Sequence, residues 1–480
     1  MFEVNVAARS IAPFAELVGH ERVVALEREA AELRELLGAR AIFNVNSTAA
    51  GGGVAEMLRP QLRYARGRGI LTRWLVIEGP AELFRITKRL HNALHDVPGD
   101  GSPLGPEQAR IYERAMRENA VALDALVRDG DIVICHDPQT AGLVPHLLDR
   151  GALVVWRCHI GHEKSGVEVD RGWSFLRKYV ENVPVAVFSR GAYAPDWLSE
   201  TRTSVLKPTI DPFSAKNQPM TDDAMRAILC EAGLIDGAGG CGAPIFTRDD
   251  GSVGRVDSRA EVMCMGPAPA WNMPLVVQVS RWDRMKDPVG VLEGFAYHVA
   301  SAAHRRAQLV LAGPQMRAVA DDPEGPQVFG EVERVWRELP KALRQSILLA
   351  QLPMDDEEEN AAIVNALQRH ATVVIQKSLR EGFGLTVTEA MWKSRPVVAS
   401  AVGGIQDQID DGVDGVLVHD PRDMQAFGDA ICGVLDDPAR AKRLGAAAHR
   451  RVLDGSLSIT SLEQWAALVR GMLVRPSDAV

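Results

Sequence analysis

Residues 372–389, TVVIQKSLREGFGLTVTE, decide the fold, because they run from a Val/Ile-rich segment through a glycine turn into an amphipathic segment. A continuous apolar run without polar alternation predicts a strand buried on both faces, as in a parallel sheet covered by helices. Gly382 and Gly384 permit a sharp turn, and the helix predicted to follow would offer free N–H groups and the positive end of its dipole. The stretch therefore predicts an α/β sheet with an anion-binding site at the end of one strand.

The same alternation of strand-like and helical segments continues on both sides of this stretch. Helical patterns such as AELFRITKRLHNALH and NAAIVNALQRH separate the apolar runs, which is the βαβ pattern of a doubly wound domain. The predicted strands are 41–46, 73–79, 131–138, 153–161, 183–190 and 204–210, and then 275–281, 308–314, 346–353, 372–378, 395–400 and 415–420. The fold class is therefore α/β, with two doubly wound, Rossmann-like domains.

The domain boundaries follow from where this alternation stops and resumes. It stops near Pro208, and a Gly/Pro-rich stretch with weak periodicity occupies 236–272. Ligands of doubly wound sheets bind beyond the carboxyl ends of the strands, so two such sheets facing each other predict an interdomain cleft. The expected parts are a helical extension over 1–38, an N-terminal Rossmann-like domain over 39–210, a linker with an insertion over 211–273, a C-terminal Rossmann-like domain over 274–458, and a helix over 459–480 that crosses back to the first domain.

The composition excludes several classes of protein. The 480 residues exceed one ordinary core, and no apolar run approaches the roughly 18 residues that a membrane span requires. The first residues, MFEVNVAARSIAPF, have no basic or apolar region of a signal peptide, and the net charge of −9 argues against a nucleic-acid partner. The six cysteines show no close pair, which favours free thiols in a reducing cytoplasm.

Two glutamates flank the glycine turn. Glu381 lies on the predicted loop beside the anion-binding helix start, and Glu389 lies about a turn into the helix, where a carboxylate could accept two hydroxyl hydrogen bonds such as a ribose offers. The alternative is a common strand–turn–helix unit with solvated glutamates. The predicted donor-binding residues of this turn are Gly382, Phe383, Gly384, Leu385 and Glu389.

A pair of basic residues follows the first strand of the second domain, in SRWDRMKDP at 280–288. Arg281 and Lys286 leave the strand end together and could clamp a diphosphate, the arginine with two hydrogen bonds and the lysine as a point charge. The alternative is a charged loop in which Asp283 and Asp287 neutralise both.

The first domain carries further candidates at its strand ends. Gly51, Gly52 and Gly53 lie between a strand and a helix and could bring backbone N–H groups close to a phosphate or a sugar, although a tight turn without a ligand is the equal alternative. The stretches CHDPQ and RCHIG place three more polar side chains at strand ends, where no third or fourth metal ligand accompanies them. These residues are His136, Asp137 and His159, and His136 is the one of them for which a structural role is favoured.

Taken together, these motifs resemble the family 4 glycosyltransferases, which are similar to glycogen synthase in their C-terminal half. NVNSTAAGGGVAEML, VICHDPQTAGL, VWRCHIG, REGFGLTVTEAMWK and AVGGIQDQIDDG resemble, within that family, the trehalose glycosyltransferring synthases, over roughly residues 39–470. The resemblance implies the GT-B fold and retaining transfer from a nucleotide sugar. The extension over 1–38 and the insertion over 236–272 depart from the family pattern and leave acceptor access and oligomer contacts open.

The resemblance also implies roles for individual residues. Arg281 and Lys286 would hold the donor diphosphate and stabilise the charge that develops on the leaving oxygen. Glu381 would bind the donor sugar, and Glu389 the ribose. The resemblance further implies that His159 lies near the donor glucose and that Asp137, with His136, lies near the acceptor. The predicted catalytic residues are Arg281, Lys286, Glu381 and His159.

The expected function is synthesis of α,α-trehalose from ADP- or UDP-glucose and glucose, with no cofactor and no essential divalent metal. Three alternatives remain: a trehalose phosphorylase, a family 4 glycosyltransferase with another acceptor, and a non-catalytic nucleotide-sugar binding protein. The expected partners are the small-molecule sugar and nucleotide-sugar substrates and a second copy of the chain in a homodimer, with no nucleic acid and no membrane span.

Overall fold

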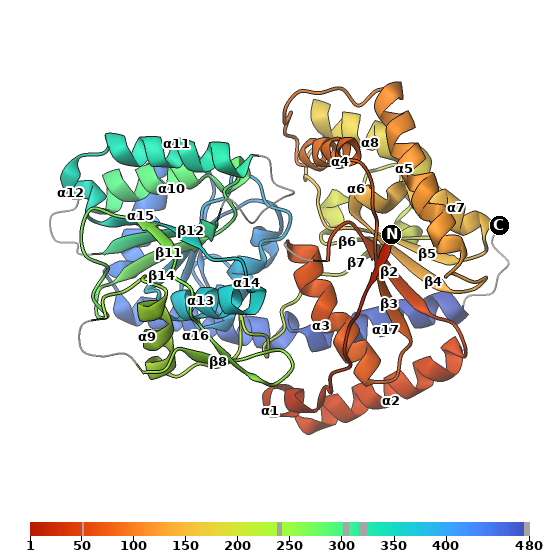
Figure 1. Ribbon diagram of the computed structural model, residues 1–480, viewed down its shortest axis with the longest axis horizontal. Coiled ribbons are helices and arrows are strands. Elements are labelled where there is room, and N and C mark those ends of the chain that lie inside the picture. Colours follow the sequence, from red (N-terminus) through yellow and green to blue (C-terminus); the bar gives the residue numbers. More distant parts are fainter. Residues whose placement is uncertain (50–51, 238–241, 301–306, 316–323, 475–480) are drawn as a thin grey trace. The chain divides into compact units, whose positions relative to one another are not determined.

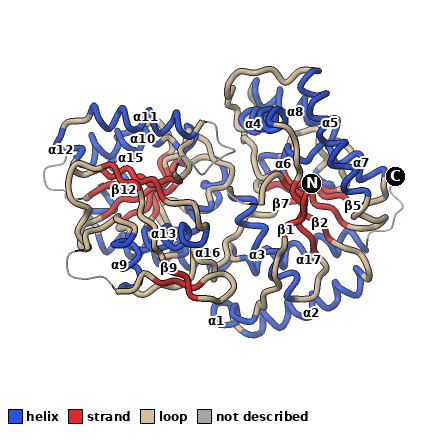
Figure 2. Tube along the Cα trace, in the orientation of Figure 1, coloured by secondary structure: helices blue, strands red, loops and turns tan. Residues whose placement is uncertain are grey.

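The computed structural model describes residues 1–49, 52–237, 242–300, 307–315 and 324–474. The chain forms two compact units, unit 1 over 1–209 and 456–480 and unit 2 over 210–455. Each unit is an α/β domain with one seven-stranded sheet (Figures 1 and 2). These two sheets confirm the predicted fold class.

The sheet of unit 1 has the order β1-β3-β2-β4-β5-β6-β7. All neighbouring strands pair in parallel except β1, which pairs antiparallel with β3 at the edge. The strands are β1 Phe2–Val4, β2 Ile42–Asn46, β3 Thr72–Val76, β4 Ile132–His136, β5 Leu153–Cys158, β6 Val185–Phe188 and β7 Thr203–Val205. Both faces are apolar because helices cover both, which is why the strands read as continuous apolar runs.

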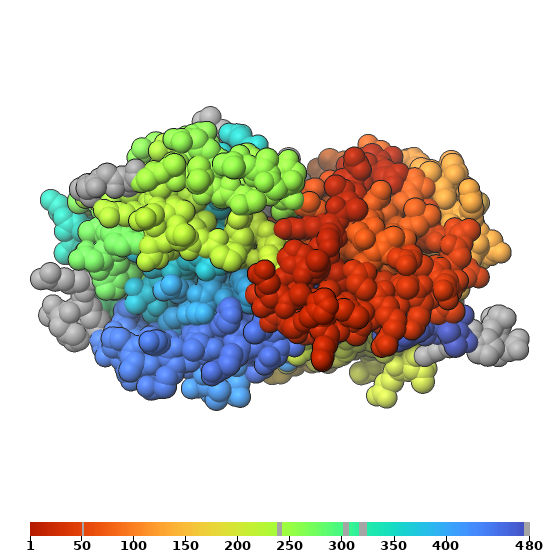
Figure 3. All heavy atoms as spheres, turned by 90° about the horizontal axis from the view of Figure 1, so that it is seen from below, coloured from red at the N-terminus to blue at the C-terminus, as the bar shows by residue number. Residues whose placement is uncertain are grey.

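The helices of unit 1 form a layer on each face of this sheet (Figure 1). One layer contains α4 Ala81–Leu94, α5 Pro106–Asp124, α7 Val144–Asp149 and α8 Val167–Val180, and the other contains α2 His20–Leu37, α3 Gly53–Gly67 and α17 Ser458–Val474. The short helices are η1 Ala12–Phe14, α1 Ala15–Val18, α6 Asp137–Thr140, η2 Ala141–Leu143, η3 Gly191–Tyr193 and η4 Glu200–Arg202. Helix α17 packs beside α2, so the last described helix of the chain lies against its N-terminal segment, and Figure 3 shows blue C-terminal atoms next to red N-terminal ones.

The sheet of unit 2 has the order β10-β13-β12-β11-β14-β15-β16, again with one antiparallel edge strand, β10. The strands are β10 Glu261–Met263, β11 Leu275–Val279, β12 Gln308–Pro314, β13 Ile347–Leu352, β14 Val373–Gln376, β15 Val397–Ser400 and β16 Val416–Val418. A separate antiparallel pair, β8 Ile245–Thr247 and β9 Val253–Arg255, completes the strands of this unit within the described residues.

Helices again cover both faces of the sheet in unit 2 (Figure 1). One face carries α10 Pro288–Phe295, the π-helical turn η6 Ala296–Ala300, α11 Gly325–Glu338 and α15 Met424–Leu435, and the other carries α13 Glu357–His370 and α14 Leu385–Trp392. The remaining helices among the described residues of unit 2 are α9 Asp222–Glu231, η5 Arg284–Lys286, α12 Lys341–Arg344, η8 Gly403–Asp407 and α16 Pro438–Gly455.

Two segments differ from the expected domain organisation. The first 38 residues contain the expected helix, α2, but Phe2 and Val4 also pair with Val76 and Trp74, so the segment extends the first sheet. Residues 211–273, expected as a linker, belong to unit 2. Arg248 ties the β8–β9 hairpin to helix α13 through ion pairs with Asp356 (2.5 Å) and Glu358 (3.1 Å), so packing and charge make the insertion part of the domain.

The cysteines depart in part from the expectation of free thiols. Cys135, Cys158, Cys264 and Cys432 are free, whereas Cys230 is disulfide-bonded. The spacing of the cysteines in the sequence gave no sign of this bond, because a disulfide joins residues that the fold brings together. Among the described residues, no helix is both long and apolar enough to cross a membrane.

Candidate functional site

The strand order of unit 2 determines where its ligands bind. Strands β11 and β14 are neighbours although two strands separate them in the sequence, and the chain winds outward from them in both directions. This is the topological switch point, where the loops after the two strands diverge and leave a crevice for a ligand. The loop after β11 carries Arg281 and Lys286, and the loop after β14 carries Glu381.

Lys286 and Glu381 form an ion pair at this switch point. The Lys286 Nζ atom lies 2.6 Å from both Glu381 carboxylate oxygens. The Ser378 hydroxyl also donates a hydrogen bond to Glu381 Oε2, at 3.1 Å. Only 9% of Glu381 is exposed, so the pair is held in one geometry. The fold therefore brings two of the predicted catalytic residues together.

Hydrogen bonds between the two loops fix this geometry. Gln278, buried on β11, donates to the Lys286 carbonyl oxygen at 3.1 Å and accepts from the Lys377 backbone N–H at 3.0 Å. The Leu379 backbone N–H donates to the Met285 carbonyl oxygen at 2.8 Å. The Lys377 ammonium group is itself paired with the Asp287 carboxylate. The backbone near the ion pair is thus preorganised by its own strands.

Arg281 occupies a more exposed position in the same loop. Its side chain is 43% exposed, and its Nη2 atom lies 3.7 Å from Oδ2 of the buried Asp283. Asp283 also accepts a hydrogen bond from the Met285 backbone N–H, at 2.8 Å, which caps helix η5. The alternative interpretation is a charged loop in which Asp283 and Asp287 neutralise Arg281 and Lys286. Asp283 does lie near Arg281, whereas Asp287 pairs with Lys377 and not with Arg281 or Lys286.

The glycine turn before helix α14 has the conformation that its sequence predicts. Gly384 is the N-cap of α14 and has a φ of 89°, which L-residues rarely adopt. A Cβ atom on Gly404 would lie 2.7 Å from the Phe383 Cα atom, so a second loop approaches the turn closely. Gly382 accepts a hydrogen bond from Gly404 there, at 3.2 Å, and Leu385 begins the helix.

Glu389 lies inside helix α14 and is only 3% exposed. Its Oε1 atom lies 3.8 Å from the Lys216 Nζ atom. Behind it, Lys393 is buried and donates hydrogen bonds to the side chains of Gln368 at 2.7 Å and Asn217 at 3.0 Å. Burial lowers the pKa of Lys393 well below its usual value, and the charge of Glu389 opposes that shift. Sequence reasoning missed both lysines, because Lys216 is distant from the glycine turn along the chain and nothing in the sequence shows that Lys393, four residues after Glu389, is buried.

The switch point of unit 1 lies between β2 and β4, which are neighbours although β3 separates them in the sequence. His136 ends β4, and its Nδ1 atom lies 3.1 Å from the His159 Nε2 atom in the loop after β5. The two rings stack with an angle of 9° between them, and His136 Nε2 lies 3.1 Å from Asn44 Oδ1. The structure therefore brings the predicted histidines together and adds Asn44, which sequence reasoning did not single out.

Asp137 follows His136 in a left-handed backbone conformation, with a φ of 63°. Its Oδ1 atom accepts a hydrogen bond from the His159 backbone N–H at 2.7 Å. Burial raises the pKa of Asp137 to about 7, although this hydrogen bond and the charge of Arg157 oppose the shift. Asp137 thus titrates near neutral pH and can accept or donate hydrogen bonds there.

Arg157 is a fully buried cation beside this group. It lies on β5 opposite His136, and its guanidinium carbon lies 5.1 Å from the centre of the Trp465 ring. Burial lowers the pKa values of His136 and His159 well below their usual range, and the positive charge of Arg157 lowers them further. Both imidazoles are therefore neutral at physiological pH and can exchange hydrogen bonds with sugar hydroxyls.

The predicted glycine loop of unit 1 lies only partly within the described residues. Gly51 falls outside them. Gly52 is the N-cap of helix α3, with a φ of 96°, and Gly53 is the first residue of that helix. Gly52 and Gly53 thus lie at a helix N-terminus that follows the end of β2, as the sequence predicts.

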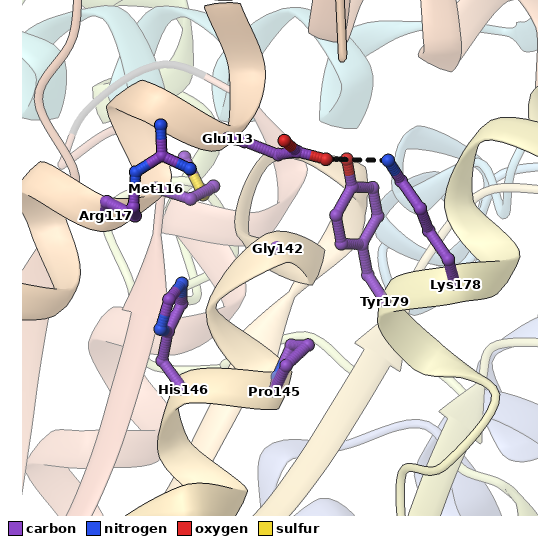
Figure 4. Close-up of a pocket in the computed structure, with 8 residues that line it drawn as sticks. All are labelled: Glu113, Met116, Arg117, Gly142, Pro145, His146, Lys178 and Tyr179. Atoms are coloured by element: carbon purple, nitrogen blue, oxygen red, sulfur yellow. Dashed lines mark hydrogen bonds and ion pairs between the residues drawn. The ribbon is translucent and has the colours of Figure 1, made fainter. Parts of the chain in front are cut away.

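A separate pocket lies among the helices of unit 1, with a volume of about 260 Å³ (Figure 4). At one edge of it, Glu113 accepts hydrogen bonds from the Lys178 ammonium group at 2.6 Å and from the Tyr179 hydroxyl at 3.0 Å. Its other lining residues are Met116, Arg117, Gly142, Pro145 and His146. None of the predicted site residues lines this pocket. In the described parts of the chain, no three His, Cys, Asp or Glu side chains are grouped so as to hold a metal ion.

Comparison with known proteins identifies the family. The model described as "Trehalose synthase, N-terminal domain" matches residues 44–195, and the model described as "Glycosyl transferases group 1" matches residues 270–451. The chain is 32% identical over 470 residues to the trehalose synthase of Pyrococcus horikoshii, which covers 98% of both chains. The chain belongs to the trehalose synthase family of glycosyltransferases.

This membership confirms the predicted enzyme class, a glycosyltransferase. The chain is also 24% identical to the trehalose phosphorylase of Pleurotus pulmonarius, over 97% of this chain and 62% of that protein. In structure it is similar to the α,α-trehalose-phosphate synthase (UDP-forming) of Burkholderia vietnamiensis, with a TM-score of 0.66 and 16% identity over 90% of this chain and 98% of that one. That likeness shows the GT-B fold.

Proposed function

We propose that this glycosyltransferase makes α,α-trehalose from a nucleoside-diphosphate glucose and glucose, with retention of configuration at the donor carbon. The observation that carries the proposal is the ion pair of Lys286 with Glu381 at the switch point of unit 2, next to the helix start at Gly384. A cation, a carboxylate and free N–H groups at one strand edge suit a sugar attached to a diphosphate. The trehalose synthases that match over nearly the whole chain support the choice of product.

The chemistry requires stabilisation of a leaving diphosphate. The bond between the donor C1 atom and the diphosphate oxygen breaks, and a bond forms between C1 and the anomeric hydroxyl oxygen of the acceptor. The acceptor proton passes to the departing phosphate oxygen, so no protein nucleophile is needed. Lys286 and Arg281 stabilise the negative charge that develops on that oxygen. Glu381 accepts hydrogen bonds from the donor sugar, and Glu389 accepts them from the ribose.

The polar group of unit 1 supplies the sugar contacts. His159 and His136 are neutral and share a hydrogen-bonding contact, so they offer donors and acceptors that keep their geometry. Asp137 has one carboxylate oxygen engaged with the His159 backbone, and a pKa near 7. We assign His159 to the donor glucose and Asp137, with His136, to the acceptor. Because Lys286 and Arg281 provide the charge stabilisation, the reaction needs no divalent metal.

A trehalose phosphorylase is the second candidate, and its support is the similarity to the Pleurotus protein. The role proposed for Glu389 favours the synthase, because a reaction that uses free phosphate has no ribose for this carboxylate to bind. The product of each reaction distinguishes the two.

The experiment is a donor and acceptor screen with identification of the products. Incubation with ADP-glucose or UDP-glucose and glucose should give α,α-trehalose and the nucleoside diphosphate in equal amounts, and NMR of the anomeric protons reports the configuration. Excess EDTA should leave the rate unchanged. Formation of glucose 1-phosphate from trehalose and phosphate, without turnover of either nucleotide sugar, would establish the phosphorylase instead.

A further inference from the structure

Unit 1 contains a second cavity, on the face of the sheet covered by helices α2, α3 and α17. Its volume is about 70 Å³, whereas a single water molecule needs roughly 10–15 Å³. Its walls are mostly apolar, and Asn44, which also lies 3.1 Å from His136, is part of them. The apolar lining residues are Leu33, Ile42, Leu62, Ala65, Ile70, Ile134, Leu462, Trp465, Ala466 and Val469.

Three residues of this lining have a buried hydrogen-bond donor that lacks an acceptor. The atoms are Arg68 Nη1, Thr72 Oγ1 and Trp465 Nε1, none of which has a hydrogen-bond partner in the part of the chain that the structure describes. Arg68 and Thr72 are only 3% and 2% exposed. Among the described residues, the Arg68 guanidinium donates one hydrogen bond, from Nε to the Tyr64 carbonyl oxygen, and this bond is long at 3.4 Å.

The chemistry of these donors indicates the ligand. A buried polar group without a partner costs about 1–3 kcal/mol, and more when it is charged. Burial lowers the pKa of Arg68, although the negative charges of Glu27, Glu29 and Glu463 oppose this shift. Guanidinium N–H, hydroxyl O–H and indole N–H can all donate, so a partner that accepts several hydrogen bonds satisfies them, and a partner with negative charge also pairs with the Arg68 cation. A carboxylate has these properties, and the apolar walls suit a hydrocarbon body attached to it.

We propose that this cavity is a binding site for a small carboxylic acid with an apolar body, held by Arg68, Thr72 and Trp465. The proposed ligand-binding residues are not among the proposed glycosyl-transfer residues, although Asn44 of the lining contacts His136, and the proposal does not depend on the assignment of those residues. Water is the competing occupant of the cavity. The charge of the ligand distinguishes the two possibilities, because a cavity that only holds water gives no preference for an anionic ligand over a neutral one.

The test is calorimetric titration of the full-length chain with propionate, and with propanol and propionamide as neutral ligands of the same length. Propionate should bind with one-to-one stoichiometry and at least about tenfold more tightly than either neutral ligand, because its charge pairs with a buried cation. Equal binding of propionate and propanol, or no binding of propionate, would overturn the proposal.

Variants locate the bound acid. Arg68→Gln should reduce propionate affinity to that of propanol, whereas Arg28→Gln, an exposed arginine of helix α2, should leave it unchanged. Ala466→Phe fills the cavity and should abolish binding. Thr72→Val keeps the side-chain shape and should weaken binding several-fold. This variant tests the site if Arg68→Gln does not fold. Full binding by the Ala466→Phe variant, or equal losses in both arginine variants, would contradict this site.

Discussion

Lys286 and Glu381 lie 95 residues apart in the sequence, yet the lysine Nζ atom lies 2.6 Å from both oxygens of the glutamate. The contact depends on the pairing of β11 with β14, which puts the two following loops side by side. A lysine in this position meets a carboxylate in the free enzyme, so a substrate phosphate must share or replace that partner. The ion pair thus holds the cation in place before the donor arrives.

Removal of the Lys286 charge should reduce turnover. In the Lys286→Ala variant, we expect kcat to fall by roughly 10²–10³, which is the typical cost of removing one preorganised group that stabilises the transition state. The measurement is steady-state release of nucleoside diphosphate. Arg284→Ala is the matched control, because Arg284 lies in the same short helix η5 but is 47% exposed and paired with Glu331. Equal activity of the Lys286→Ala variant and the control would contradict the assigned role.

Glu389 should act on donor affinity rather than on the bond-breaking step. Glu389→Gln keeps the size of the side chain and removes its charge, so we expect KM for the nucleotide sugar to rise roughly 10- to 100-fold with a smaller change in kcat. Glu338→Gln, an exposed change at the end of α11, serves as the control. A fall in kcat at unchanged KM would instead place Glu389 in the chemical step.

Gly384 should tolerate no side chain. Its φ of 89° costs an L-residue roughly 1–2 kcal/mol, and a Cβ atom would lie 3.1 Å from Ile405. We therefore expect Gly384→Ala to lower the free energy of unfolding and to weaken donor binding. Gly330→Ala, inside helix α11 with nothing within 4 Å of the added atom, should instead be neutral or stabilise by about 0.5–1 kcal/mol. Chemical denaturation with a donor titration checks both, and equal effects would contradict the prediction.

Asp137 should make stability depend on pH. Its pKa is about 7 in the folded chain and near 3.9 when unfolded, so the folded state holds a proton that unfolding releases. This contribution to the free energy of unfolding is fully present below about pH 4, decreases as pH rises, and is lost above about pH 7. Asp137→Asn cannot ionise, so the wild-type value minus the variant value should decrease across this window.

His136 and His159 make stability depend on pH in the opposite direction. Their pKa values in the folded chain lie well below 6.5, so protonation at acid pH destabilises the fold. The wild type and the Asp137→Asn variant both contain these histidines. Their effect therefore largely cancels when the free energy of unfolding of the variant is subtracted from that of the wild type. Urea unfolding followed by tryptophan fluorescence at several pH values is the measurement, because Trp156 Nε1 donates a hydrogen bond to the Asp137 carbonyl oxygen. A flat difference would show that Asp137 is ionised throughout.

The sequence predicts most of the parallel strands because each is buried on both faces and reads as an uninterrupted apolar run. The run at 308–314 matches β12 residue for residue, and the run at 372–378 contains β14. The edge strands β1 and β10 are not predicted, because each spans only three residues and is partly exposed, so neither forms a continuous apolar run. Such short strands exist because a neighbouring strand is available for pairing, and local sequence does not encode that neighbour.

The candidate site divides in a similar way. Residues at strand ends, such as Lys286 and His159, can be found from sequence because the carboxyl edge of a parallel sheet is where ligands bind. Lys216 cannot, because it reaches Glu389 only through the packing of unit 2. Lys393 lies four residues after Glu389 and donates to its backbone carbonyl oxygen at 3.2 Å, but its burial against Gln368 and Asn217 depends on that packing. Arg157 lies within a strand and shows its buried charge only once Trp465 covers it.

Helix α17 has a consequence for the order in which the chain folds. Unit 1 includes residues 456–480, so the ribosome completes all of unit 2 before the last part of unit 1 emerges. Since domains fold as units during synthesis, unit 2 can reach its native state before α17 has been synthesised and packed against the sheet of unit 1. Until then, the face that carries Ile134 and Arg157 stays uncovered by that helix, and a nascent chain at this stage offers chaperones an apolar surface to bind.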